Sequence, residues 1–233
     1  MPFKFNLNIR IGALLTLIGF ILSGPVAVAI LLNFAPQPTW QSAEAFKANF
    51  NWLQTLPYFF GFYLVSGLVL LVFAHKNEYK GRSHDLDNAL NLAFASILLF
   101  AGLILFNYIC QTTFVPHMAL DTSGGNDDLI SGFSMSNPRS LSWSIEMWGY
   151  AILGKAFWLL SGCYAKTNKV IPALLSANLI LSIASLIWSI INPEWVETTL
   201  GLILFMIWNA LMMLIAWLMY MHARTNQASP EFG

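Results

Sequence analysis

Charged side chains are scarce in this chain of 233 residues, because Asp, Glu, Lys and Arg together make up only 9% of it. An ordinary soluble domain carries about 25% charged residues. Hydrophobic residues reach 57%, and the formal net charge is zero, so the chain has no basic surface that would attract nucleic acid. This composition indicates an integral membrane protein, whose first partner is the lipid bilayer.

Cysteines and catalytic motifs are also scarce. The two cysteines, Cys110 and Cys163, fall toward opposite ends of neighbouring predicted spans, too far apart to form a disulfide. The four histidines do not pair at metal-ligand spacing, and GxSxG, HExxH and phosphate-binding glycine loops are absent from the sequence. We therefore expect no metal and no cofactor, and the sequence favours a binding or transport protein over an enzyme.

Six predominantly apolar runs are long enough to form membrane-spanning helices. They cover about residues 11–34, 52–74, 89–111, 143–165, 170–191 and 198–221. The predicted fold class is therefore all-α: a polytopic membrane helix bundle with six transmembrane helices, forming a single domain over residues 1–228. The last five residues, 229–233, resemble a remnant of a cloning vector and are left out of this domain.

Basic residues in the predicted connections set the orientation of the six spans. Short cytoplasmic loops carry an excess of Lys and Arg. One side has only Lys47 and Arg139, whereas the other collects Lys4, Arg10, Lys76, Lys80, Arg82, Lys166, Lys169 and Arg224. This asymmetry predicts that the N- and C-termini are both cytoplasmic.

Several polar residues fall near the middle of the predicted spans. Lys155 lies about ten residues from either end of the fourth span, roughly 15 Å from each interface, so its side chain cannot reach water along the helix. We expect it to face the bundle interior, where it either bonds to another helix or lines a cavity. The leading hypothesis is a cavity that binds or transports a small amphipathic or lipid-like ligand, lined by Tyr63, Lys155, Asn178, Ser182, Ser185 and Asn209.

Glu146, in the same span, does not pair with Lys155. Nine residues separate the two, which places them on opposite helix faces and roughly 13 Å apart along the axis. Glu146 lies near the outer interface, where it either stabilises its own helix start or joins Asn107, Gln111 or Arg139. An alternative function follows, that of an intramembrane enzyme acting on a lipid-like substrate, with Glu146 as acid or base oriented by Asn107 or Gln111. A third is an accessory or scaffold subunit that forms a homo-oligomer or binds a protein partner.

Two short segments carry a family resemblance. Ser144-Ile-Glu-Met-Trp-Gly-Tyr150 and Trp208-Asn209 resemble uncharacterised six-span inner-membrane proteins of bacteria. The resemblance implies a multi-pass protein of the bacterial inner (cytoplasmic) membrane, and it implies no particular activity.

Overall fold

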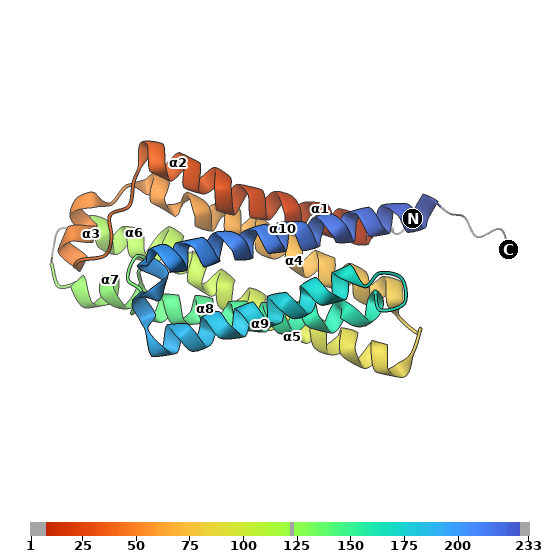
Figure 1. The fold of residues 1–233 in the computed structure, drawn as a ribbon. Coiled ribbons are helices and arrows are strands. Elements are labelled where there is room, and N and C mark those ends of the chain that lie inside the picture. The colour runs from red at the N-terminus through yellow and green to blue at the C-terminus, as the bar shows by residue number, and fades with distance from the viewer. Residues whose placement is uncertain (1–7, 122–123, 229–233) are drawn as a thin grey trace, which may run out of the picture.

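The computed structural model describes residues 8–121 and 124–228, and every regular element in these ranges is a helix (Figure 1). The chain runs along the bundle in six long helical passes. These are α1–η1–α2 (Ile9–Ile21, Leu22–Val26 and Ala27–Phe34), η2–α4 (Trp52–Thr55 and Leu56–Tyr79), α5–η3–α6 (His84–Ile109, Cys110–Phe114 and Val115–Leu120), α8–η4 (Leu141–Leu159 and Leu160–Cys163), α9 (Val170–Ile191) and α10 (Thr199–Ala228).

Five of these passes are long and apolar enough to cross a membrane, which indicates a membrane protein and confirms the predicted all-helical class. They are the passes that begin at Ile9, Trp52, His84, Val170 and Thr199. The predicted fourth span is present as α8, but Glu146, Lys155 and several Ser and Trp residues lower its hydropathy, and it is not among the five. The number of six spans therefore stays a prediction.

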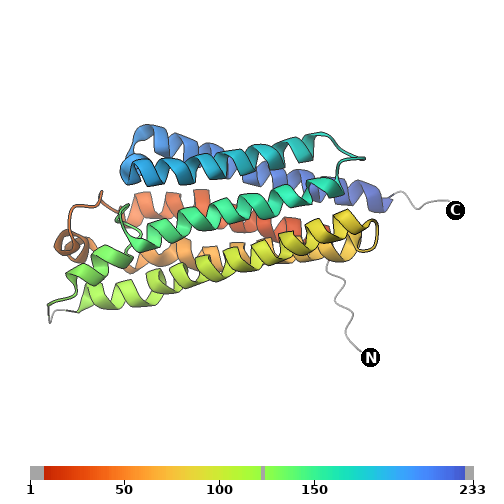
Figure 2. The ribbon, with the colours of Figure 1, turned by 90° about the horizontal axis from the view of Figure 1, so that it is seen from below.

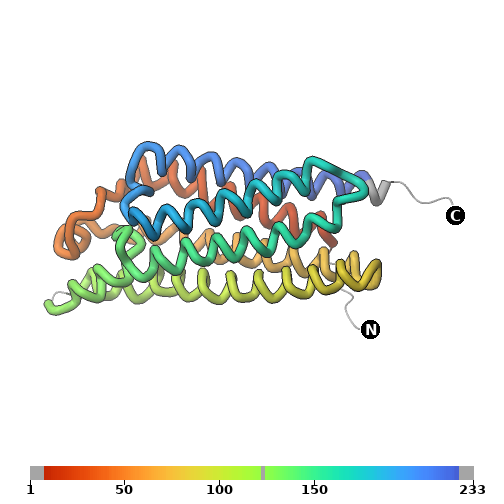
Figure 3. The backbone as a smooth tube through the Cα atoms, turned by 60° about the horizontal axis from the view of Figure 1, so that its bottom comes forward, coloured from red at the N-terminus to blue at the C-terminus, as the bar shows by residue number. Residues whose placement is uncertain are grey.

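The six passes form a ring. Going around the bundle, neighbouring helices follow the order α1, α4, α5, α8, α9, α10, and α10 packs again on α1 (Figures 2 and 3). The α9–α10 pair is the most loosely packed of the six neighbouring pairs. This seam between α9 and α10 is important for the site described below.

The two ends of the bundle differ. The start of α1 and the end of α10 lie together at one end, with the α4–α5 and α8–α9 turns; we call it the turn end (Figure 1). The opposite end, the loop end, carries α6 and the short helices α3 (Ala43–Asn49) and α7 (Asp127–Phe133). A 3-10 turn, η5 (Pro193–Glu197), joins α9 to α10 there.

Glycine allows α1 and α4 to pack with their backbones nearly touching. A Cβ atom added at Gly12 or Gly19 would lie 2.6 Å from the Cα atom of Leu71 or Leu64, respectively, on α4. Without a strong hydrophobic force between helices in lipid, association depends on this kind of close contact between small residues. The α1–α4 pair is therefore closely packed, whereas the α9–α10 seam is loosely packed.

Several predicted boundaries were too short. The second pass continues to Tyr79, and the third begins at His84 and runs to Leu120, into the first part of the connection between the predicted third and fourth spans. His75, predicted in a turn, is fully buried inside α4, since its Nδ1 lies 2.8 Å from the Leu71 carbonyl oxygen and its Nε2 2.5 Å from the Tyr164 hydroxyl. Because the polar atoms of His75 have these partners, α4 continues past this residue. The connection between the first two passes contains the short helix α3.

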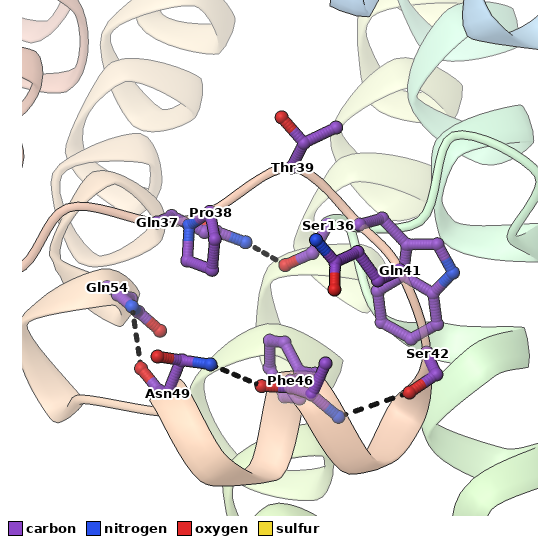
Figure 4. A pocket seen from close by; sticks show the side chains of 11 residues that line it. Gln37, Pro38, Thr39, Gln41, Ser42, Phe46, Asn49, Gln54 and Ser136 are labelled. Atoms are coloured by element: carbon purple, nitrogen blue, oxygen red, sulfur yellow. Dashed lines mark hydrogen bonds between the residues drawn. The ribbon is translucent and has the colours of Figure 1, made fainter.

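Polar contacts tie the elements of the loop end together. Lys47 on α3 donates to Asp127 on α7 at 2.6 Å, and this bond lowers the pKa of the Asp127 carboxyl. Gln37 donates to Ser136, which joins the segment before α3 to the one before α8 (Figure 4). These bonds hold α3, α7 and their flanking loops as a cap over the loop end of the bundle.

Candidate functional site

The carboxyl group of Glu146 is the centre of the candidate site. The Ser140 hydroxyl caps the start of α8 by accepting from Trp143 N at 3.1 Å, so Glu146 lies in the second turn. Its side chain, 4% exposed, accepts three hydrogen bonds from neutral donors. The Tyr150 and Tyr108 hydroxyls donate to Oε1 at 2.6 and 3.2 Å, and the Asn107 amide donates to Oε2 at 2.8 Å. Both oxygens of the carboxyl group therefore have hydrogen-bond partners.

Gln111, one turn beyond Asn107, anchors this network to the loop end. Its amide nitrogen donates to the Phe133 carbonyl at 2.7 Å, and its amide oxygen accepts from Met135 N at 3.0 Å. The same nitrogen lies 3.4 Å from the Asn107 oxygen. Glu146, Asn107 and Gln111 therefore meet as predicted, while Arg139 pairs with Glu194 at 2.7 Å instead.

A cavity of about 170 Å³ adjoins the Glu146 carboxyl, and we call it the polar chamber. It lies inside the ring, where α1, α4, α5, α8 and α10 converge near the loop end. Its lining consists of Phe20, Ser23, Pro57, Tyr58, Leu64, Tyr108, Met135, Trp143, Glu146, Met147, Tyr150, Phe205, Trp208 and Asn209. Glu146 is the one charged residue in this lining.

A second cavity, of about 230 Å³, lies beside the first, and we call it the apolar chamber. It is bounded by α8, α9, η5 and α10. Five residues belong to the walls of both chambers: Trp143, Met147, Tyr150, Phe205 and Trp208. The rest of its lining is Ser182, Ser185, Trp195, Val196, Leu202 and Leu204.

The apolar chamber reaches the outside of the bundle at the α9–α10 seam. Two residues of its wall, Leu202 and Phe205, are 56% and 45% exposed, so they contact both the cavity and the surroundings of the bundle. Phe205 also lines the polar chamber, so the two chambers share this partly exposed wall.

Two polar atoms in the chamber walls have no hydrogen-bond partner in the part of the chain that the structure describes. They are the indole nitrogen of Trp143 and the hydroxyl of Ser182, both buried. Leaving a buried polar group without a partner costs about 1–3 kcal/mol. Both atoms lack surface exposed to the chamber interior, so they belong to the packed walls and not to the bonding groups that the chambers expose.

The residues predicted from depth alone divide into two groups. Ser182 and Ser185 line the apolar chamber, and Asn209 lines the polar chamber. Asn178 lines neither, but its amide oxygen accepts a hydrogen bond at 2.9 Å from the indole of Trp208, which lines both. Their binding role stays a prediction.

Tyr63 and Lys155 form the second group, since neither lines either chamber. Tyr63 is 38% exposed and Lys155 lies on the exposed face of α8, so the expectation that Lys155 faces the interior is wrong. The reason is that position along a span predicts depth but not the direction in which a side chain points. Glu146 and Lys155 do face opposite sides of α8, as their spacing predicted.

Two residues of the site had no signal of their own in the sequence. Tyr58, at the start of α4, and Trp208, on α10, both line the polar chamber. Aromatic residues near the ends of spans are usually interfacial anchors. The position of Trp208 next to Asn209 was the one available sign that it belonged to a polar site.

A smaller cavity, of about 80 Å³, lies in the cap at the loop end (Figure 4). Its walls come from residues 37–42, α3, η2 and Ser136, and several of its amide groups are already bonded within the wall. The Gln54 amide, for example, donates to the Asn49 carbonyl at 3.2 Å. Its size and internal bonding fit a packing gap in the cap.

No protein-family model matches the chain, and no curated protein or solved structure matches it either. The geometry of the two chambers is therefore the basis for a functional proposal.

Proposed function

We propose that the protein spans the bacterial inner membrane six times, with α8 as the fourth span and both termini in the cytoplasm, and that it binds or transports a small amphipathic molecule. The topology is supported by the excess of Lys and Arg at the turn end and by the parallel course of α8 among its neighbours. Reporter fusions at residues 124 and 228 test it, because only the fusion after α10 should report a cytoplasmic position.

The observation that supports the binding role is the pair of adjoining chambers with opposite character. The apolar chamber opens toward lipid at the α9–α10 seam, and the polar chamber beside it contains a buried carboxyl group, two tyrosine hydroxyls and Asn209. A ligand with an apolar tail and a polar group matches this pair, since each part would meet a wall of its own kind. Small-molecule pockets are mostly apolar with a few placed polar groups.

The size of the chambers limits the ligand. Pockets for small molecules have volumes of roughly 300–1,000 Å³. Each chamber alone, at about 170 or 230 Å³, is smaller than that range, whereas a ligand that occupied both would have a volume within its lower part. A single-chain amphiphile would fit better than a two-chain phospholipid, whose second chain would remain in the bilayer.

Filling the apolar chamber tests the proposal. Leu204→Trp should block the tail site, and the variant should lose the amphiphile that is extracted with the purified wild-type protein and detected by mass spectrometry. Leu200→Trp is the matched control, since Leu200 is 51% exposed and lies outside the chamber lining. Equal amphiphile content in the wild type and both variants would contradict the proposal.

An intramembrane enzyme is the second candidate, and the Asn107–Glu146 bond favours it, because a catalytic acid or base needs a fixed orientation. A substrate in the polar chamber would exchange a proton with Glu146. If extraction yields a ligand, incubation with wild-type protein and with Glu146→Gln separates the two functions. Conversion by the wild type alone supports the enzyme, and an unchanged ligand supports binding or transport.

A further inference from the structure

The polar chamber combines one carboxyl group with many aromatic rings. Seven of its fourteen lining residues are aromatic, and the carboxyl of Glu146 is the one ionisable group in the lining besides the tyrosines. Lys and Arg are absent from the described residues that line it. The wall therefore presents one carboxyl and several π faces, and no cation of its own.

The aromatic rings surround the chamber at an angle to one another. The Tyr150 and Trp208 rings have centroids 4.8 Å apart and planes inclined by 47°. The Tyr58 and Tyr108 rings lie 5.5 Å apart at 54°. All four of these rings belong to residues that line the polar chamber.

Such a wall selects for positive charge. The face of an aromatic ring carries negative potential and attracts ammonium groups, and sites that bind quaternary ammonium ions use several rings at once. An anionic group would meet the Glu146 carboxyl without a cation to offset the repulsion. A neutral group would gain no charge interaction from either the rings or the carboxyl.

We infer that the polar group of the bound amphiphile is an ammonium cation, held beside Glu146 by the rings of Tyr58, Tyr108, Tyr150 and Trp208, while its chain occupies the apolar chamber. This inference rests on the proposed binding function and adds the chemical class of the ligand. The volume of about 170 Å³ accommodates a compact group such as trimethylammonium or a primary amine.

Three probes with the same dodecyl chain test the charge requirement. They are dodecyltrimethylammonium, its neutral analogue in which carbon replaces nitrogen, and dodecyl sulfate. Binding to protein in nanodiscs is followed by the fluorescence of Trp143 and Trp208, with the other seven tryptophans of the chain as background. We expect the ammonium probe to bind at least about tenfold more tightly than the neutral one, and the sulfate to bind weakest.

The outcomes separate the inference from the function that it rests on. Equal binding of the ammonium and neutral probes would overturn the ammonium inference and leave amphiphile binding intact. Failure of all three probes to bind would overturn both. Tightest binding of the sulfate would overturn the inference as well, because it would require a positive wall.

Two variants locate the charge preference within the chamber. Glu146→Gln should reduce the preference for the ammonium probe over the neutral probe to about threefold or less. Tyr58→Leu should reduce the same ratio while leaving the carboxyl group and its hydrogen bonds in place, because Tyr58 makes no hydrogen bond to Glu146. This second variant tests the inference even if Glu146→Gln does not fold. Glu78→Gln, at an exposed carboxyl of the turn end, is the control and should keep the wild-type ratio. Wild-type ratios in both chamber variants would overturn the inference.

Discussion

Replacing Glu146 with leucine should destabilise the protein by about 1–3 kcal/mol. Leucine removes the acceptor of three hydrogen bonds in a buried place. The Asn107 amide keeps the Ser142 carbonyl as a second acceptor, at 3.2 Å. The Tyr108 and Tyr150 hydroxyls also lie within hydrogen-bond reach of each other, so one can donate to the other and a single hydroxyl loses its acceptor. An unpaired buried group costs about 1–3 kcal/mol. Water in the polar chamber would bring the total toward the lower value.

Thermal unfolding in a neutral detergent, followed by tryptophan fluorescence, measures this effect. A chain of this length loses about 2–4 °C of Tm per kcal/mol, so we expect a decrease of about 2–12 °C. The triple variant Glu146→Leu, Tyr108→Phe, Tyr150→Phe should recover much of the loss, because removing both partners of a hydrogen bond is nearly neutral. A wild-type Tm for the single variant, or a triple variant no more stable than it, would refute the reasoning.

Three other changes give distinct outcomes in the same unfolding assay. Lys155→Leu should leave Tm unchanged or raise it, because the Lys155 side chain is exposed and makes no hydrogen bond in the described structure. The substitution should also favour membrane insertion by about 3 kcal/mol. A lower Tm would show that Lys155 has a stabilising partner. Tyr164→Phe should cost about 1–3 kcal/mol by leaving Nε2 of buried His75 unpaired, and no change would show that water replaces the hydroxyl. Gly19→Ala should cost about 1–3 kcal/mol, since the new Cβ would lie 2.6 Å from the α4 backbone. Gly102→Ala is the control, because a Cβ atom at Gly102 would meet no other atom within 4 Å, and it should cost nothing or stabilise the helix.

The helical passes could be predicted from hydropathy because a spanning helix must satisfy its backbone internally over about 20 residues. Their ends could not be predicted equally well. Helix α4 extends beyond its predicted end at residue 74 because the polar side chain of His75 finds partners in the folded protein. Hydropathy treats such residues as exposed to water, and the tertiary structure decides otherwise.

The candidate site could be predicted in part. Helical geometry correctly separated Glu146 from Lys155, and similar depth correctly brought Asn107 and Gln111 toward Glu146. Which face of α8 points inward depends on its packing against α5 and α9, which its sequence alone does not encode. The cost of a charge in lipid favoured an interior Lys155, whereas the three donors around Glu146 made that carboxyl the buried charge.

The loose α9–α10 seam has a consequence for the rates of ligand exchange. A ligand that enters through the seam requires only these two helices to separate, while the α1–α4 side of the ring stays closed at its glycine contacts. Residues at the seam, such as Leu202, would then set the height of the barrier between bilayer and cavity. Residues deep in the cavity would set the equilibrium occupancy. Entry and exit could therefore be accelerated or slowed together, with the affinity unchanged.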